Sequence, residues 1–230
     1  MIFLTVIRQL KTTSIGGRQF LKDCIKLFCG ITIYSFGVYL TIAANIGLAP
    51  WDCLGMGISY HTPLNYGLSM TIMSVVILLV DLALGERIGF GTIIDAFCTG
   101  NFIQLFNQFD PLPTPPNLLT GVLLMLVGLA IMALGQFLYM GAGQGLGPRD
   151  ALFVAVGRRL RTIPIGAVQV DVFAAVLLVG FLLGGPVGLG TIVSTFGAGA
   201  IMQAVFDLLH FEPRSVVQRD VLQVLSNWRA

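Results

Sequence analysis

Two octapeptides decide how this chain is organised: NIGLAPWD at residues 45–52 and GQGLGPRD at residues 143–150. They share a Gly-Leu pair, a proline and an aspartate at the same spacing, and they begin 98 residues apart. Chance similarity between apolar segments would match Leu with Val rather than Gly, Pro and Asp at fixed positions. The sequence therefore predicts an internal duplication.

The duplication extends to both sides of the octapeptides. At the same offset, Gly30, Gly37 and Ala44 match Gly128, Gly135 and Ala142. After one inserted residue the offset becomes 99, and the matching pairs are Gly67/Gly166, Gly91/Gly190, Thr92/Thr191, Phe97/Phe196, Gly100/Gly199 and Gln104/Gln203. Residues seven apart drift by only about 20° around a helix, so each set of small residues forms one stripe. Because small residues let helices approach closely in lipid, we expect the helices that contain residues 37 and 135 to pack together.

Composition indicates the class of protein to which the chain belongs. The 230 residues are 56% hydrophobic and only 10% charged, and mean hydropathy is +0.88. A typical soluble domain is about 25% charged, so this chain cannot cover a water-exposed surface. The net charge of +2 gives no electrostatic basis for binding nucleic acid. A polytopic membrane protein remains, with the lipid bilayer as its surroundings.

A membrane-spanning helix needs about 20 mostly apolar residues. Six stretches approach that length, at residues 27–44, 67–84, 90–109, 118–140, 165–183 and 191–209. Two shorter pieces, 51–60 and 150–160, would cross only about half of the hydrocarbon core. They are predicted half-helices, which could re-enter the membrane, lie at its interface or form part of a broken span. The segment DPLPTPPN at 110–117 is too rich in proline for a helix.

Charge favours one topology over another. If the short pieces do not cross, each half has three spans and the halves are inverted; if they cross, each half has four spans and the halves are parallel. With an internal N-terminus, the inverted scheme places all 13 Lys and Arg on the cytoplasmic side, as the positive-inside rule favours. We therefore predict an all-α membrane protein with six transmembrane helices in two inverted three-helix repeats, each with a short half-helix.

This scheme divides the chain into five parts. Residues 1–26 form a cytoplasmic amphipathic segment, 27–109 the first repeat, 110–117 an outer linker, 118–209 the second repeat and 210–230 a cytoplasmic tail. Both termini are then cytoplasmic. The oligomeric state does not follow from the sequence.

The repeated motif has two interpretations. Pro50 and Pro148 suit the first position of a helix, Asp52 and Asp150 then lie in the first turn, and Gly47 and Gly145 permit a tight bend. The motif could therefore be only a well-capped helix start. Alternatively, broken helices in an inverted pair present backbone dipoles and polar side chains to a substrate.

Polar residues inside spans are costly in lipid and therefore informative. Asp95 and Asp171 are candidates for lining a cavity or for carrying protons. The matched Gln104 and Gln203, with Asn101, are candidate substrate ligands, although hydrogen bonding between helices is the simpler interpretation. Trp51 and Arg149 could be interfacial anchors, or Arg149 could bind Asp150 or an anionic ligand. Asp81 and Asp207, near span ends, are expected to be solvated.

No catalytic signature is evident. The four cysteines lack metal-ligand spacing with histidines, and no HExxH, GxSxG or Walker A motif occurs. We therefore expect no metal, no cofactor and no enzymatic activity.

The doubled motif at 47–52 and 145–150, with the GxGT stretches at 89–92 and 188–191, resembles the YczE/YyaS/YitT family of bacterial multi-pass membrane proteins, most closely its YczE-like branch. The resemblance covers about residues 27–209 and implies a bacterial cytoplasmic membrane protein, without implying a substrate.

The function expected from the duplicated, broken-helix architecture is that of a small secondary transporter or channel-like permease for a small solute. The alternative is a non-transporting scaffold or accessory protein that assists a partner.

Overall fold

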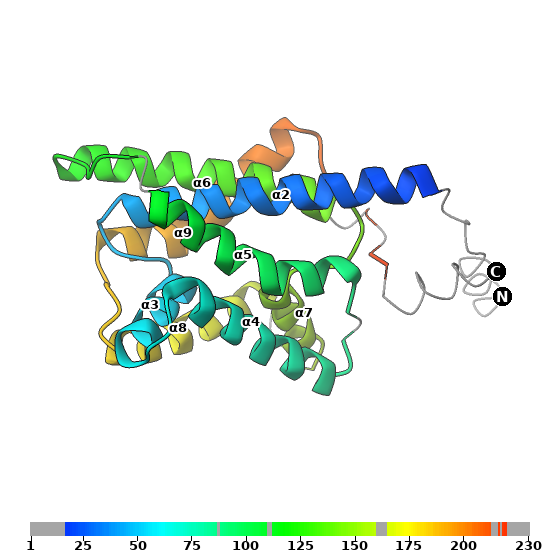
Figure 1. The fold of residues 1–230 in the computed structure, drawn as a ribbon, viewed down its shortest axis with the longest axis horizontal. Coiled ribbons are helices and arrows are strands. Elements are labelled where there is room, and N and C mark those ends of the chain that lie inside the picture. The colour runs from blue at the N-terminus through cyan, green and yellow to red at the C-terminus, as the bar shows by residue number, and fades with distance from the viewer. Residues whose placement is uncertain are drawn as a thin grey trace.

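The computed structural model describes residues 17–86, 88–109, 112–159, 165–212, 216, 218 and 219. All regular secondary structure in these residues is helical, without strands, which confirms the predicted all-α class. The helices are α2 (Gly17–Ala43), α3 (Pro50–His61), α4 (Tyr66–Ala83), α5 (Phe90–Phe109), α6 (Leu118–Met140), α7 (Pro148–Arg159), α8 (Ile165–Leu182) and α9 (Leu189–Leu208) (Figure 1). Among them α2, α4, α6 and α9 are long and apolar enough to cross a membrane.

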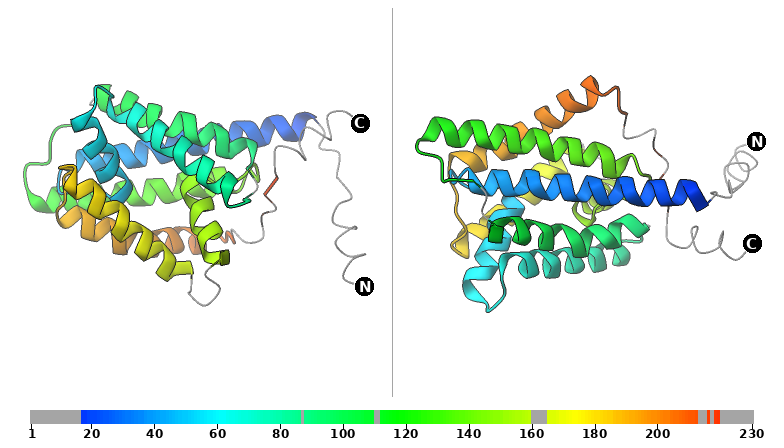
Figure 2. Two further views of the ribbon diagram at one scale, coloured as in Figure 1. Left: turned by 90° about the horizontal axis from the view of Figure 1, so that it is seen from below. Right: turned by 45° about the horizontal axis from the view of Figure 1, so that its top comes forward.

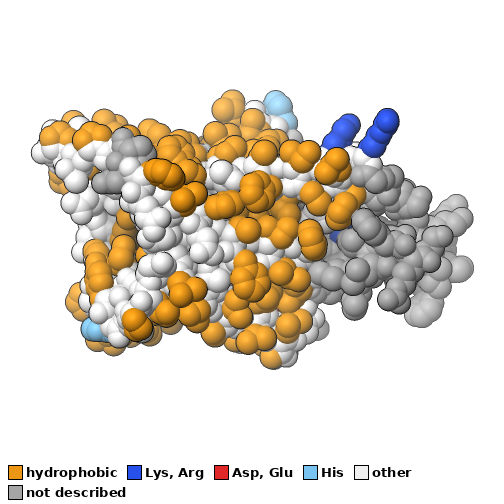
Figure 3. All heavy atoms as spheres, viewed as in Figure 1, with side chains coloured by type: hydrophobic (Ala, Val, Ile, Leu, Met, Phe, Trp, Pro, Cys, Tyr) orange, Lys and Arg blue, Asp and Glu red, His pale blue; other side chains and the backbone are white. Residues whose placement is uncertain are grey.

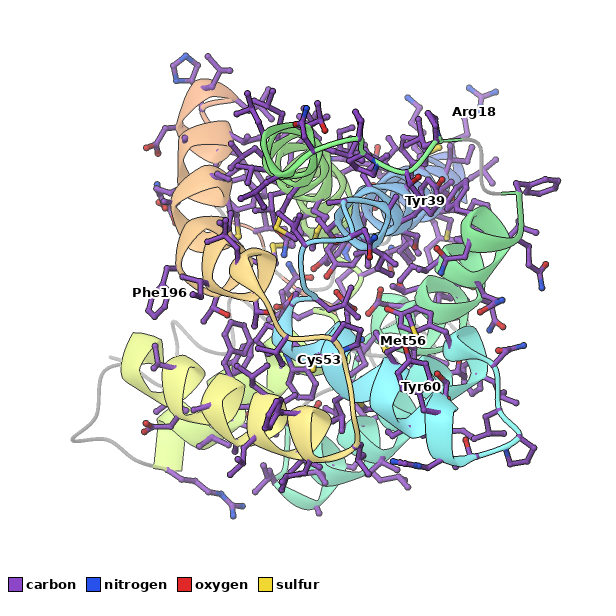
Figure 4. All side chains as sticks on the ribbon, turned by 90° about the vertical axis from the view of Figure 1, so that its left-hand side faces the viewer. Arg18, Tyr39, Cys53, Met56, Tyr60 and Phe196 are labelled. Atoms are coloured by element: carbon purple, nitrogen blue, oxygen red, sulfur yellow. The ribbon has the colours of Figure 1, made fainter. Side chains whose placement is uncertain are left out.

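The first helix begins earlier than predicted. α2 starts at Gly17, almost three turns before residue 27, so the end of the predicted amphipathic segment 1–26 continues into the first span. Arg18 and Lys22 are exposed on this extension, and Figure 4 shows Arg18 projecting away from the bundle. Residues 1–16, and most of the predicted tail 210–230, lie outside the described residues.

Two asparagines cap the N-termini of α4 and α6. Asn65 accepts a hydrogen bond from Leu68 N at 2.8 Å, and Asn117 accepts one from Thr120 N at 2.9 Å. Asn117 and Thr120 also form a reciprocal capping box, which satisfies amides that would otherwise lack partners at the start of α6. The described part of the proline-rich linker, residues 112–117, is not helical.

The pair α2 and α6 is the most extensive helix contact in the bundle, and Figures 1 and 2 show the two helices side by side. Their backbones touch through the predicted stripes of small residues. A Cβ atom added to Gly37 would lie 2.8 Å from the carbonyl oxygen of Gly128, and one added to Gly128 would lie 2.9 Å from that of Gly37. The predicted packing of these two helices is confirmed.

The short helices α3 and α7 lie toward opposite ends of the bundle (Figures 1 and 2). Each is preceded by a glycine with φ of +110°, Gly47 before α3 and Gly145 before α7, a conformation that residues with a Cβ rarely adopt. Each short helix packs against a long helix from the other half of the chain, α3 against α8 and α7 against α4. The two halves are therefore interlocked.

The loops before the short helices make matching contacts. Gly190 N donates to Ile46 O at 2.7 Å, and Gly91 N donates to Gln144 O at 2.7 Å. Ile46 corresponds to Gln144 at the 98-residue offset, and Gly91 to Gly190 at the 99-residue offset. Each loop is thus fastened to the start of the last helix of the other half.

The helix pair α4–α5 and the corresponding pair α8–α9 pack differently. α4 and α5 are in close contact: a Cβ atom on Gly100 would lie 2.6 Å from Gly67 O, and Gly67 N donates to Gln104 Oε1 at 3.2 Å. α8 and α9 make almost no contact in their described residues. Gly199, the counterpart of Gly100, has no atom within 4 Å of a Cβ position, and Figure 4 shows Phe196 of α9 pointing away from the bundle.

The surface is largely apolar. On the face shown in Figure 3, many of the side chains are hydrophobic, and the blue Lys and Arg atoms gather at one end. The prediction that Asp81 is solvated is wrong: it is 1% exposed, and neither carboxylate oxygen has a hydrogen-bond partner among the described residues. α7 packs against α4, and Arg159 at the end of α7 donates to Leu84 O just after the end of α4, contacts that the sequence position of Asp81 could not reveal.

We predict that Gly128→Ala destabilises the protein while Gly199→Ala does not. The added methyl group would collide with the α2 backbone at residue 128 but meets open space at residue 199, where alanine also gains about 1 kcal/mol in helix propensity. Thermal unfolding of both variants in the same detergent measures the difference. Equal melting temperatures for the two variants would contradict the close α2–α6 packing.

Candidate functional site

The two aspartates of the repeated motif accept hydrogen bonds from tyrosines. Asp52, in the first turn of α3, accepts from the Tyr66 hydroxyl at 2.9 Å, and Asp150, in the first turn of α7, accepts from the Tyr139 hydroxyl at 2.8 Å. The N-cap residue of α3, Ala49, makes no side-chain capping bond. The carboxylates still lie at helix N-termini, where the dipole favours negative charge, but their hydrogen bonds join helices instead of capping one.

Arg149 lies deep in the bundle, among residues of the first half. Its guanidinium is 5.4 Å from the centre of the Trp51 ring, and its Nη2 atom is 3.7 Å from Met70 Sδ. It is close enough to Asp52 and Asp95 to attract both carboxylates electrostatically. Arg149 is therefore not an anchor at the cytoplasmic surface.

Asp95 joins this group from α5. The hydroxyl of Thr99, one turn later, donates to Asp95 Oδ1. A Cβ atom at Gly147 would lie 2.8 Å from Asp95 Oδ2 and 3.7 Å from Asp150 Oδ2. The absence of a side chain at Gly147 therefore lets two carboxylates from different helices converge on one point.

Tyr34 of α2 lies among all four charges. Its hydroxyl is within electrostatic range of Arg149 and of the three aspartates, and its ring meets that of Tyr139 edge to face, with centroids 6.0 Å apart. We call Tyr34, Asp52, Tyr66, Asp95, Tyr139, Arg149 and Asp150 the central cluster. It joins α2, α3, α4, α5, α6 and α7.

The central cluster is not sealed. Asp52, Tyr66 and Tyr139 are 3%, 5% and 4% exposed, whereas Tyr34, Asp95, Arg149 and Asp150 each keep part of their surface accessible. Charged side chains this deep in an apolar bundle are stable only when they have partners of opposite charge or contact water. The accessible members are the ones that a small molecule could touch.

Sequence reasoning missed the aromatic residues in and beside the central cluster. Trp51 was expected at the membrane interface, but it is 8% exposed and lies against Arg149. Tyr34 and Tyr139 were not candidates, because an aromatic residue inside an apolar span usually serves only packing. Only the structure shows that their hydroxyl groups lie among carboxylates.

Four predicted candidates lie elsewhere. Asp171 is exposed on a face of α8 that also carries the exposed Leu178 and Leu182, so it does not line the central cluster. Asn101 Nδ2 donates to Thr71 Oγ1 at 3.3 Å, and Gln104 accepts from Gly67; both join α5 to α4, as the simpler interpretation predicted.

The fourth is Gln203, which donates to Asp207 at 2.7 Å on the exposed surface of α9. Among the motif residues, Gly47 and Gly145 form the bends, and Pro50 and Pro148 begin the short helices. In the described part of the chain, no three Cys, His, Asp or Glu side chains are grouped as a metal site requires.

These features define a multi-pass α-helical membrane protein with a polar cluster in its interior. The model of a family of unknown function, DUF6198, matches residues 21–207, so the chain belongs to this family. No solved structure matches the chain.

Three relatives are similar over most of their length. An uncharacterized protein of Haemophilus influenzae is 30% identical over 197 residues, covering 86% of this chain and 88% of that protein. The uncharacterized membrane protein YczE of Bacillus subtilis is 29% identical, covering 76% and 81%, and the uncharacterized protein YyaS of the same organism is 29% identical, covering 79% and 92%. The resemblance to the YczE/YyaS family is confirmed.

We predict that Tyr139→Phe lowers the free energy of unfolding by about 1–3 kcal/mol, because it removes a hydrogen bond to the carboxylate of Asp150 deep in the bundle. Tyr60→Phe is the matched control, since Tyr60 is 58% exposed and Figure 4 shows it at the end of α3, outside the central cluster. Thermal or denaturant unfolding in one detergent compares the two. A Tyr139→Phe variant as stable as the control would show that this bond contributes nothing.

Proposed function

We propose that the protein is a small secondary transporter for a small solute, which binds at the central cluster. The observation that carries the proposal is the position of that cluster: one guanidinium and three carboxylates lie between the starts of two half-length helices from opposite halves of the chain. Broken helices that point their N-termini at a polar site are a recurring design of transporters built from inverted repeats. A purely structural bundle could replace these charges with apolar residues.

We further propose that α2, α4 and α5 form one three-helix repeat and α6, α8 and α9 the other, in inverted orientation. The matching loop contacts, Gly190 N to Ile46 O and Gly91 N to Gln144 O, support two equivalent units, as do the two glycines with φ of +110°. The short helices then approach the site from opposite faces of the membrane. By the positive-inside rule both termini are cytoplasmic, in the cytoplasmic membrane of a bacterium.

The different packing of matching helices supports transport by alternating access. α4 and α5 are in close contact, while α8 and α9 make almost no contact in their described residues, although both pairs carry glycines at matching positions. In an inverted pair, an exchange of these two conformations between the halves turns the access path from one face of the membrane to the other. Such an exchange requires that the same sequence motif can pack in two ways.

The inverted orientation predicts that the ends of α3 and α7 are reached from opposite sides. In a variant without native cysteines, Tyr60→Cys should react with an impermeant thiol reagent from outside the cell. Arg159→Cys should react only from the cytoplasm, in inverted vesicles. Both target positions are exposed. Reaction of both from the same side would replace the inverted arrangement with a parallel one.

Alternating access predicts two mutually exclusive disulfides. Thr71 and Asn101 are in contact between α4 and α5, and at the 99-residue offset their counterparts are Val170 and Ala200. Thr71→Cys with Asn101→Cys should form an intramolecular disulfide in the conformation described here. Val170→Cys with Ala200→Cys should form one only after exchange. Gel mobility and peptide mass spectrometry measure both.

In the four-cysteine variant, the first disulfide should prevent the second. Formation of both in one molecule, or no disulfide between residues 170 and 200 under any condition, would count against exchange. A protein that never exchanges would fit the accessory or scaffold function instead.

A further inference from the structure

The guanidinium of Arg149 lacks an oxygen partner in the described part of the chain. Its contacts there are the face of Trp51 and the sulfur of Met70, and no ion pair joins it to an acidic residue within the described ranges. A guanidinium has five N–H donors arranged to hold a carboxylate. Because Arg149 is partly accessible, these donors are available to an anionic group of a bound molecule.

The carboxylates of Asp95 and Asp150 lie within electrostatic range of Arg149, but in the described part of the chain neither forms an ion pair with a basic side chain. Both approach the bare backbone of Gly147, and each accepts one described hydrogen bond, from Thr99 and from Tyr139 respectively. Two carboxylates that converge in an apolar bundle repel each other unless a proton or a cation lies between them. An ammonium group has three donors for their remaining lone pairs.

Two aromatic residues supply further contacts beside these charges. The indole N–H of Trp51 is buried and has no hydrogen-bond partner among the described residues, although the face of its ring lies against Arg149. The hydroxyl of Tyr34 lies within range of all four charges, and the residue is partly accessible. The Tyr34 hydroxyl can therefore donate to a small polar molecule.

We propose that the central cluster binds a small zwitterion that carries one carboxylate and one ammonium group, as free amino acids do. The carboxylate binds Arg149 near the helix N-termini, where dipoles favour an anion. The ammonium group lies between Asp95 and Asp150. This inference rests on the proposed function and adds the substrate class to it.

Singly charged molecules fit the central cluster less well. A simple anion would meet Arg149 but also the repulsion of three carboxylates, and a simple cation would satisfy the carboxylates but meet the repulsion of Arg149. Only a molecule with both charges offers each group its opposite, and unpaired charges against the wrong ligand are a strong source of specificity.

The experiment is a ligand screen on the full chain, purified in detergent and reconstituted in liposomes. The twenty proteinogenic amino acids are tested one by one for thermal stabilisation, and those that stabilise are tested for counterflow. Each amino acid that binds is compared with the amine that lacks its carboxylate and the acid that lacks its ammonium group. We expect at least tenfold weaker binding of both analogues.

Variants assign each charge of the ligand to its partner. Arg149→Gln should abolish the preference for the amino acid over the amine, and Asp150→Asn should abolish the preference over the acid. Asp207→Asn, an exposed aspartate on α9, is the matched control and should keep both preferences. A change in preference separates ligand contact from a loss of stability, which would weaken all ligands alike.

The outcomes separate this inference from the proposed function. If no amino acid binds, or if an amine or an acid binds as tightly as the zwitterion, while the disulfides between residues 71 and 101 and between 170 and 200 still exclude each other, the substrate class is wrong and the transporter proposal stands. If an amino acid binds with the expected preferences but the disulfides do not exchange, the zwitterion site stands and transport fails.

Discussion

The attraction between Arg149 and the carboxylates around it is the interaction on which the rest of the structure depends. A guanidinium and three carboxylates deep in an apolar bundle are costly unless charges of opposite sign lie nearby and hydrogen bonds satisfy the remaining oxygen atoms. The tyrosines of α4 and α6 supply two of those bonds, to Asp52 and Asp150. Six helices converge on the central cluster, and the face of the molecule shown in Figure 3 is largely apolar.

Glycine makes this convergence possible. The bare backbones of Gly37 and Gly128 bring α2 and α6 close together, and Gly147 leaves room for two carboxylates. Gly47 and Gly145 adopt a left-handed conformation that lets the chain stop, bend and begin a short helix within the bundle. Backbone that is not helical is tolerated at membrane depth only inside protein, and here each bend is held by the start of α5 or α9.

The two halves of the proposed duplication are equivalent in some contacts and different in others. The loop hydrogen bonds accepted by Ile46 and by Gln144 are both 2.7 Å long, because both are made by backbone atoms in the same motif. The α4–α5 and α8–α9 pairs differ although Gly100 and Gly199 correspond. Small residues permit close packing without enforcing it. The same pattern of glycines is therefore compatible with two helices in contact and with two helices apart. The proposed exchange between the halves uses this freedom.

The sequence by itself determined the membrane class, the helices and their order. The predicted spans at 90–109 and 118–140 coincide with α5 and α6, because about 20 apolar residues bounded by glycine or proline leave the chain few alternatives to a helix. Helical periodicity also revealed the packing of α2 on α6. The start of α2 was misjudged, since Arg18 and Lys22 interrupt the apolar run but do not interrupt a helix.

Only the tertiary structure decided which polar residues meet. Asp95 and Asp171 look alike in the sequence, yet one joins the central cluster and the other faces outward from α8. Arg149 and Trp51 resemble interfacial anchors in the sequence. In the structure each short helix packs against a helix of the other half, and the two side chains lie against each other inside the bundle. Hydrophobicity and periodicity indicate how far a helix extends and which of its faces carries small residues. The rotation of one helix against another depends on contacts between residues about a hundred positions apart, and no local pattern encodes these.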